Sequence, residues 1–217
     1  MDDDEHCCFD DWVDHWSEEA QRRPTAAKVT VSLLDALERT GLRERSVLDL
    51  GCGIGDLAIE TVRHGAVSAR GFDLSPKAIQ EARRLAAERG VGDRTTFEVG
   101  DAAELDLPSA DIVVLNRVFC CYPDVNALLE RSLAAAGSVY GFTVPRSEGF
   151  AGALGRVLTA LSNLWYRLRR KRYAGFRVYI HDVDRIDARV RAEGFVPVRR
   201  ETRRFAWDLA VYARPAA

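Results

Sequence analysis

The sequence predicts an α/β fold with an open, doubly wound, seven-stranded sheet that is mostly parallel. It also predicts a C-terminal antiparallel strand pair and an N-terminal helical extension. Two patterns indicate this. Between residues 46 and 144, short apolar runs alternate with segments of helical periodicity, which is typical of βαβ units. Between residues 195 and 213, apolar residues recur at every second position, which is typical of antiparallel strands.

The composition is that of an ordinary globular protein. The chain has 217 residues, 47% hydrophobic and 29% charged, with a net charge of −2, so it lacks the basic excess that would favour nucleic acid as a partner. The acidic first residues do not resemble a signal peptide, and no apolar run could span a bilayer, so a cytoplasmic location is expected. The five cysteines, four of them in adjacent pairs, predict neither disulfides nor a metal site.

The first 41 residues are expected to form a helical cap. Phe9, Trp12 and Trp16 recur at helical spacing, and a second helix is expected from Thr25 to Gly41. Residues 42–217 then form the main domain, with a helical insertion at about 149–181 on one side of the sheet.

Each strand of the main domain is followed by a helix or a loop. Parallel strands are expected at residues 46–50, 67–72, 95–99, 111–115 and 138–144. Ser75 and Asp124 are expected to cap the helices that end at Gly90 and Gly137. A long amphipathic helix at 149–173, a helix at 182–193 and two strands in 195–213 complete the chain.

A glycine loop follows the first strand directly. In Asp49-Leu50-Gly51-Cys52-Gly53-Ile54-Gly55, glycine allows a sharp turn and lets a ligand approach the backbone without meeting a Cβ. The spacing is G-x-G-x-G and not the G-x-G-x-x-G of pyrophosphate-binding loops, which indicates a ligand without a pyrophosphate.

Polar residues also end the next three strands. Asp73 ends the second strand and can accept hydrogen bonds from both hydroxyls of a ribose. Asp101 and Ala102 follow the third strand, where a carboxylate and a backbone N–H can bind an adenine ring, and Asn116 ends the fourth. These positions lie at one edge of a parallel sheet and predict a nucleoside site.

Together these residues resemble the class I S-adenosylmethionine-dependent methyltransferases, through VLDLGCGIG, GFDLSP and VGDAAEL. The resemblance covers residues 47–144 and implies a Rossmann-like fold with S-adenosylmethionine as the cofactor. The layout is faintly similar to magnesium-protoporphyrin O-methyltransferases. The cofactor site that the resemblance implies comprises Asp49, Gly51, Cys52, Gly53, Gly55, Asp73, Leu74, Asp101, Ala102 and Asn116.

Purely structural roles are the alternatives for several of these residues. Asp49 could bond only to loop N–H groups, Asp101 could cap a turn, and Cys52 is expected to pack as a small residue and not to react as a thiol.

The implied reaction is attack by a nucleophile on a sulfonium methyl group, for which alignment matters more than acid catalysis. Candidate bases are His181, Tyr122 and His15; each could instead be a surface or packing residue. In the family that the sequence resembles, the amino-directed nucleic-acid and protein enzymes often carry an Asn-Pro-Pro-aromatic tetrapeptide after the fourth strand. This sequence has Asn116-Arg117-Val118-Phe119 there, so the resemblance implies a small-molecule acceptor, methylated at oxygen or carbon. The alternatives are an RNA or protein methyltransferase, a non-catalytic binding subunit and a nicotinamide-dependent oxidoreductase.

The apolar stripe in residues 150–173 allows two interpretations. It could pack against the sheet edge with a solvated charged end. Alternatively, it could cover an apolar acceptor or contact a membrane surface through the basic residues at 167–172.

Overall fold

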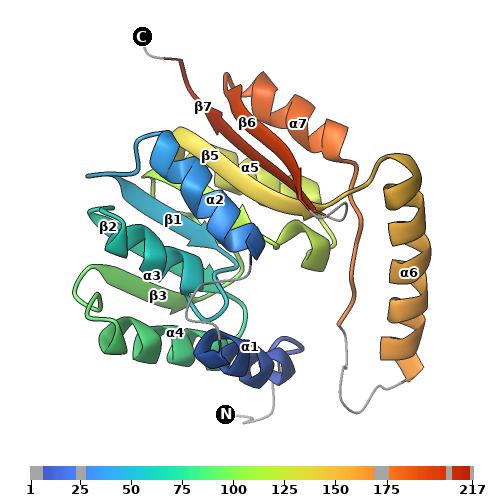
Figure 1. Ribbon diagram of the computed structural model, residues 1–217, viewed down its shortest axis with the longest axis horizontal. Helices are drawn as coiled ribbons and strands as arrows, with labels where there is room; N and C mark the ends of the chain where they lie inside the picture. Colours follow the sequence, from blue (N-terminus) through green and yellow to red (C-terminus); the bar gives the residue numbers. More distant parts are fainter. Residues whose placement is uncertain (1–6, 23–27, 169–175, 204–206, 216–217) are drawn as a thin grey trace.

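The fold is a seven-stranded sheet between helices, as predicted (Figure 1). A computed structural model describes residues 7–22, 28–168, 176–203 and 207–215. The strand order is β3-β2-β1-β4-β5-β7-β6, with β7 antiparallel to both of its neighbours and the other pairs parallel. The strands are β1 (Ser46–Leu50), β2 (Ser68–Asp73), β3 (Thr95–Val99), β4 (Ala110–Asn116), β5 (Ala136–Pro145), β6 (Val196–Arg203) and β7 (Trp207–Ala213).

Helices cover both faces of this sheet. The helices are α1 (Asp10–Arg22), α2 (Lys28–Arg39), α3 (Asp56–Arg63), α4 (Pro76–Glu88), α5 (Val125–Ala135), α6 (Gly149–Leu168) and α7 (Val183–Ala192), with a 3₁₀ turn, η1 (Phe119–Cys121). Apolar residues of α2, α3 and α4 bury one face of the sheet, and those of α5 and α7 bury the other. The order in which strands are added to the sheet switches at β1 and β4: β2 and β3 follow on one side of β1, and β4 and β5 on the other. This switch places a crevice at the carboxyl ends of β1 and β4.

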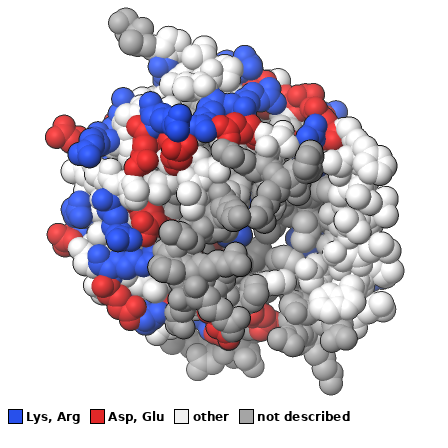
Figure 2. Space-filling view, in the orientation of Figure 1, with Lys and Arg blue, Asp and Glu red and all other residues white. Residues whose placement is uncertain are grey.

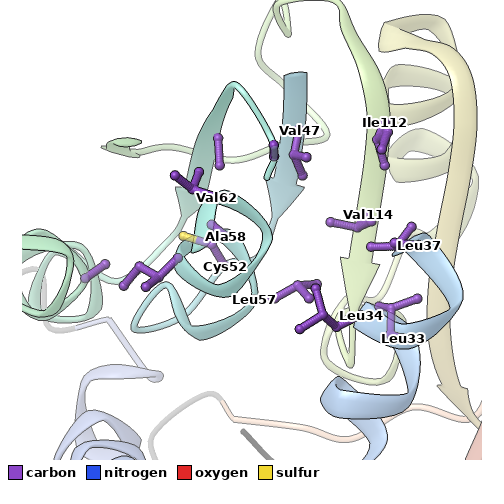
Figure 3. Close-up of a cluster of buried hydrophobic side chains, with 14 of the residues drawn as sticks. Leu33, Leu34, Leu37, Val47, Cys52, Leu57, Ala58, Val62, Ile112 and Val114 are labelled. Carbon is purple, nitrogen blue, oxygen red and sulfur yellow. The ribbon is translucent and has the colours of Figure 1, made fainter. Parts of the chain in front are cut away.

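The alternation of side chains along each strand explains the two cores. In β4, Ile112 and Val114 point toward the first face, whereas Val113 and Leu115 belong to the second. Figure 3 shows Leu33 and Leu37 of α2 packed near Val114. The second N-terminal helix therefore contributes to the main core, while α1 packs against α4.

The predicted helix caps are confirmed, with one correction at a helix end. The Ser75 side chain accepts a hydrogen bond from the Ala78 N–H at 3.0 Å, and Asp124 caps α5 in the same way. The expected helix stop at Gly137 is wrong, because β5 already begins at Ala136. A Cβ on Gly137 would lie 3.0 Å from the Ala110 carbonyl oxygen, so this glycine lets β5 approach β4.

Helix α6 stands beside the sheet and outside the two helical layers (Figure 1). Its stripe of large apolar side chains is exposed, with Leu161 58% and Leu168 77% accessible, so the interpretation in which this stripe packs on the sheet edge is wrong. The last part of the predicted helix, residues 169–173, lies outside the described residues. Among the described helices, none is long and apolar enough to cross a bilayer.

Candidate active site

A cavity of about 450 Å³ lies at the carboxyl ends of β1, β2 and β4. This volume is within the range of small-molecule sites. The cavity brings together most of the predicted site residues, namely Asp49, Gly51, Cys52, Gly53, Asp73, Leu74, Asp101, Ala102, Asn116 and Tyr122.

The glycine loop bends as its composition predicts. Gly51, Gly53 and Gly55 all have positive φ, at 66°, 54° and 79°. A Cβ on Gly51 would lie 2.5 Å from the Val118 side chain, so this position has no room for a larger residue. Gly55 is not among the lining residues. It is the N-cap residue of α3, and a Cβ there would lie 2.8 Å from the Phe97 ring.

Asp49 is a buried carboxylate with one unsatisfied oxygen. Its exposure is 1%, and Oδ1 has no hydrogen-bond partner. Burial raises its pKa to about 8, repulsion from Asp73 and Asp56 adds to the shift, and the Ala58 N–H opposes it. An oxygen in this condition is costly unless a ligand supplies a donor or a positive charge.

Asp73 is oriented by the backbone around it. Its carboxylate accepts hydrogen bonds from the Gly53 N–H at 2.8 Å and the Ser75 N–H at 2.9 Å. Burial raises its pKa, although these two N–H groups act in the opposite direction. Because a carboxylate oxygen can accept more than one hydrogen bond, Asp73 can still bind hydroxyl groups in the cavity that it lines.

Asp101 both holds a turn and lines the cavity. It accepts the Ala103 N–H at 2.9 Å, as the turn-capping alternative expects. The Tyr122 hydroxyl donates to the same carboxylate at 2.9–3.0 Å. Burial, and then this carboxylate, raise the pKa of Tyr122, so its phenol is protonated at neutral pH.

Asn116 lies in a hydrogen-bonded series at the end of β4. Its amide donates to the Thr30 hydroxyl at 2.9 Å, and its carbonyl accepts from the Thr143 hydroxyl at 2.8 Å. Thr143 also accepts the Arg117 N–H at 2.8 Å, which fixes Arg117 at a φ of 63°. Positive φ is uncommon for a residue other than glycine, and this one places a cation at the cavity.

Aromatic side chains cover the cavity and form what we call the aromatic roof. Its members are Phe9, Trp12, Trp16 and Phe176. The rings of Trp12 and Phe176 are 5.3 Å apart, and Phe176 lies 5.0 Å from Tyr166 of α6. None of these residues is predicted as a site residue from the sequence, since their distant chain positions meet only in the folded protein.

One of the predicted bases, His181, is not among the lining residues. His181 donates from Nε2 to the Tyr122 carbonyl oxygen at 2.9 Å, and the Tyr179 N–H donates to the Cys120 carbonyl oxygen at 2.7 Å. These bonds attach residues 176–182 to the segment after β4. His15 lies in α1, but its side chain is outside the described part of the chain. Within that described part, no three His, Cys, Asp or Glu side chains are grouped for a metal.

Comparison with known proteins agrees with this geometry. Residues 47–136 match the family described as a methyltransferase domain. The ribosomal protein L11 methyltransferase of Haemophilus influenzae (strain PittEE) is 42% identical over 87 residues, 40% of this chain, and the chain spans only 29% of that relative's length.

Two solved structures share the fold. The magnesium protoporphyrin IX methyltransferase of Synechocystis PCC 6803, with bound SAH, has a TM-score of 0.69 and 22% identity, over 99% of this chain and 90% of that one. The [4+2]-cyclase SpnF has a TM-score of 0.64 and 18% identity, over 86% of this chain and 82% of that one. Residues 47–136 therefore carry a methyltransferase domain, and the whole chain shares the fold of a methyltransferase solved with bound SAH.

Proposed function

We propose that the protein transfers a methyl group from S-adenosylmethionine to a small-molecule acceptor. The observation on which this depends is the unsatisfied Asp49 oxygen inside the glycine loop, beside a cavity with acidic residues at two further strand ends. A cofactor with a cationic amino-acid end and a neutral nucleoside end fits this donor set better than an anionic dinucleotide does.

Each part of the cofactor has a matching group in the cavity. Asp49 and the glycine loop would bind the methionine part, Asp73 the ribose, and Asp101 with Ala102 the adenine. Asn116, fixed through Thr30 and Thr143, would lie behind the sulfonium. When bound, the cofactor supplies an electrophilic methyl group with a neutral leaving group, so the protein's main tasks are alignment and exclusion of water.

The acceptor is proposed to have an apolar body and an anionic group. The aromatic roof provides the apolar surface, and Arg117 provides a cation at the same cavity. Tyr122, with its raised pKa, would act as a hydrogen-bond donor and not as a phenolate base. His181 would be a positioning residue, through its bond to the Tyr122 carbonyl oxygen. His15 stays a candidate base. Transfer to oxygen or carbon is proposed.

A protein acceptor is the main alternative, because the curated relatives are named for a ribosomal protein. The likeness to the Haemophilus influenzae enzyme covers 40% of this chain, so more than half of the chain lies outside it. A roof of large rings over the cavity favours a ligand that is enclosed, as a small molecule is, over a protruding protein side chain.

Binding and turnover test the two parts of the proposal separately. Calorimetry should show binding of S-adenosylmethionine and its demethylated product, with NADH as the negative control. Asp73→Ala should weaken binding by roughly 1–3 kcal/mol. The absence of cofactor binding would refute the whole proposal.

The acceptor class is tested with a methyl-labelled cofactor and a cell extract divided by molecular mass. Label in the small-molecule fraction supports the proposal, and label in ribosomal protein would replace it with the protein alternative. Cofactor binding without any transfer would favour a non-catalytic role, or a different reaction such as that for which the similar cyclase is named.

A further inference from the structure

Helix α6 is amphipathic, but its apolar face points to solvent and its small and polar residues face the protein. Its large apolar side chains face solvent, at positions that repeat every three or four residues along one face. Figure 2 shows this edge of the molecule as a continuous uncharged surface. The exposed stripe comprises Leu154, Val157, Leu158, Leu161, Leu164 and Leu168.

The opposite face of α6 is fixed to the protein by small and polar residues. A Cβ on Gly152 would lie 2.3 Å from the Ser147 backbone, so the helix is in close contact there. The Asn163 side chain donates to the Val178 carbonyl oxygen at 2.8 Å and accepts the Val178 N–H at 2.9 Å. The helix therefore cannot rotate its apolar stripe toward the protein without breaking these contacts, so the stripe is exposed in the folded protein.

The charged residues of α6 itself are all positive. The 20 residues of α6 include Arg156 and Arg167 but no Asp or Glu, and Arg177 is exposed on the returning segment. The sequence adds four more cations at residues 169–172. A second copy docked through the same stripe would bring like charges together, whereas an anionic surface would complement them.

We propose that α6 lies on an anionic lipid surface, with the exposed stripe inserted among the acyl chains and the arginines at the headgroups. An interfacial helix of this kind has an apolar face and a basic border, and it lies parallel to the membrane. Tyr166 of α6 contacts the aromatic roof through Trp12 and Phe176, so the docked helix would lie next to the cavity that takes the acceptor. The proposal does not depend on the proposed reaction.

Flotation of the full chain with vesicles tests this docking. Vesicles of phosphatidylcholine mixed with phosphatidylserine should bind the protein, and vesicles of phosphatidylcholine alone should bind it much less, with binding weakened by salt. The double variant Leu158→Glu/Leu161→Glu should partition about tenfold less or weaker still. Val67→Glu is the matched control, because Val67 is similarly exposed, at 55%, before β2.

Each outcome is decisive. Equal binding of the double variant, equal binding to both vesicle types, or no binding to either would overturn the proposal. A native chain that is dimeric by light scattering, and monomeric in the double variant, would assign the stripe to a second copy. Thermal unfolding and cofactor calorimetry of both variants verify that the fold is intact.

Discussion

Replacing Asp49 by asparagine should stabilise the free protein while weakening its cofactor site. The Asp49 pKa is raised from 3.8 to about 8 in the folded state. For an acid whose pKa is raised by folding, stability is lost as the pH rises from the unfolded value to the folded one. Each pH unit in this window costs about 1.4 kcal/mol. At pH 7 Asp49 is mostly protonated in the folded state and ionised in the unfolded one, so the raised pKa costs the native state about 4 kcal/mol.

The net gain from Asp49→Asn is smaller than this cost. The asparagine side chain keeps a buried polar group without a full set of partners, which costs about 1–3 kcal/mol. A net gain of about 1–3 kcal/mol remains, or a rise in Tm of roughly 2–12 °C for a domain of this size. The gain should increase between pH 5 and pH 8 and be constant above pH 8.

Thermal unfolding of the ligand-free protein across pH 5–9 measures this difference directly. Asp111→Asn serves as the control, because hydrogen bonds from Ser46 lower the pKa of Asp111. Loss of this carboxylate should therefore lower stability at neutral pH. A difference between Asp49→Asn and the native protein that does not change with pH would refute the reasoning. A loss of stability at pH 8 would refute it as well.

The remaining predictions concern the site. Cofactor affinity should increase up to tenfold per pH unit from pH 6 to about 8, because binding of a cationic ligand releases the proton from Asp49. Calorimetry in buffers of different ionisation enthalpy measures the released proton. Asp49→Asn should abolish the release. Arg117→Ala should raise KM for an anionic acceptor about tenfold or more, with little change in cofactor affinity, whereas unchanged kinetics would remove Arg117 from the acceptor site. Gly51→Ala should destabilise the protein by roughly 1–3 kcal/mol, since both the φ of 66° at Gly51 and the nearby Val118 side chain exclude a Cβ. The double variant Gly51→Ala/Val118→Ala should be more stable than Gly51→Ala alone. Chemical denaturation measures both free energies of unfolding.

The sequence could predict the sheet and the cofactor half of the site because these depend on local patterns. Asp49, Asp73, Asp101 and Asn116 each follow an apolar run, and parallel strands bring their carboxyl ends together whatever the distance along the chain. The same reasoning missed the Gly137 position, because a glycine that admits a neighbouring strand resembles a glycine that ends a helix.

The acceptor half could not be predicted for a different reason. Trp12 and Phe176 are far apart in the sequence, and their contact depends on how α6 and the returning segment pass the sheet. Arg117 appears in the sequence as an ordinary residue after a strand, and only its positive φ and its bond to Thr143 distinguish it. Side chains that meet only through tertiary packing have no regular spacing in the sequence, so the sequence alone does not show that they are neighbours.

The charge of the cavity determines which cofactors it can accept. Asp49, Asp73 and Asp101 line the cavity, and burial raises the pKa of the first two, so ionising these carboxyl groups in the free site is unfavourable. A pyrophosphate would bring further negative charge next to them. An ammonium group or a sulfonium would instead stabilise their ionised forms. Attraction between the cationic ligand and these carboxylates contributes to binding, and the demethylated product lacks the sulfonium charge. The affinity of the product should therefore depend less on ionic strength than that of the cofactor. Equal salt dependence of the two ligands, measured by calorimetry, would mean that the ammonium group alone senses the carboxylates.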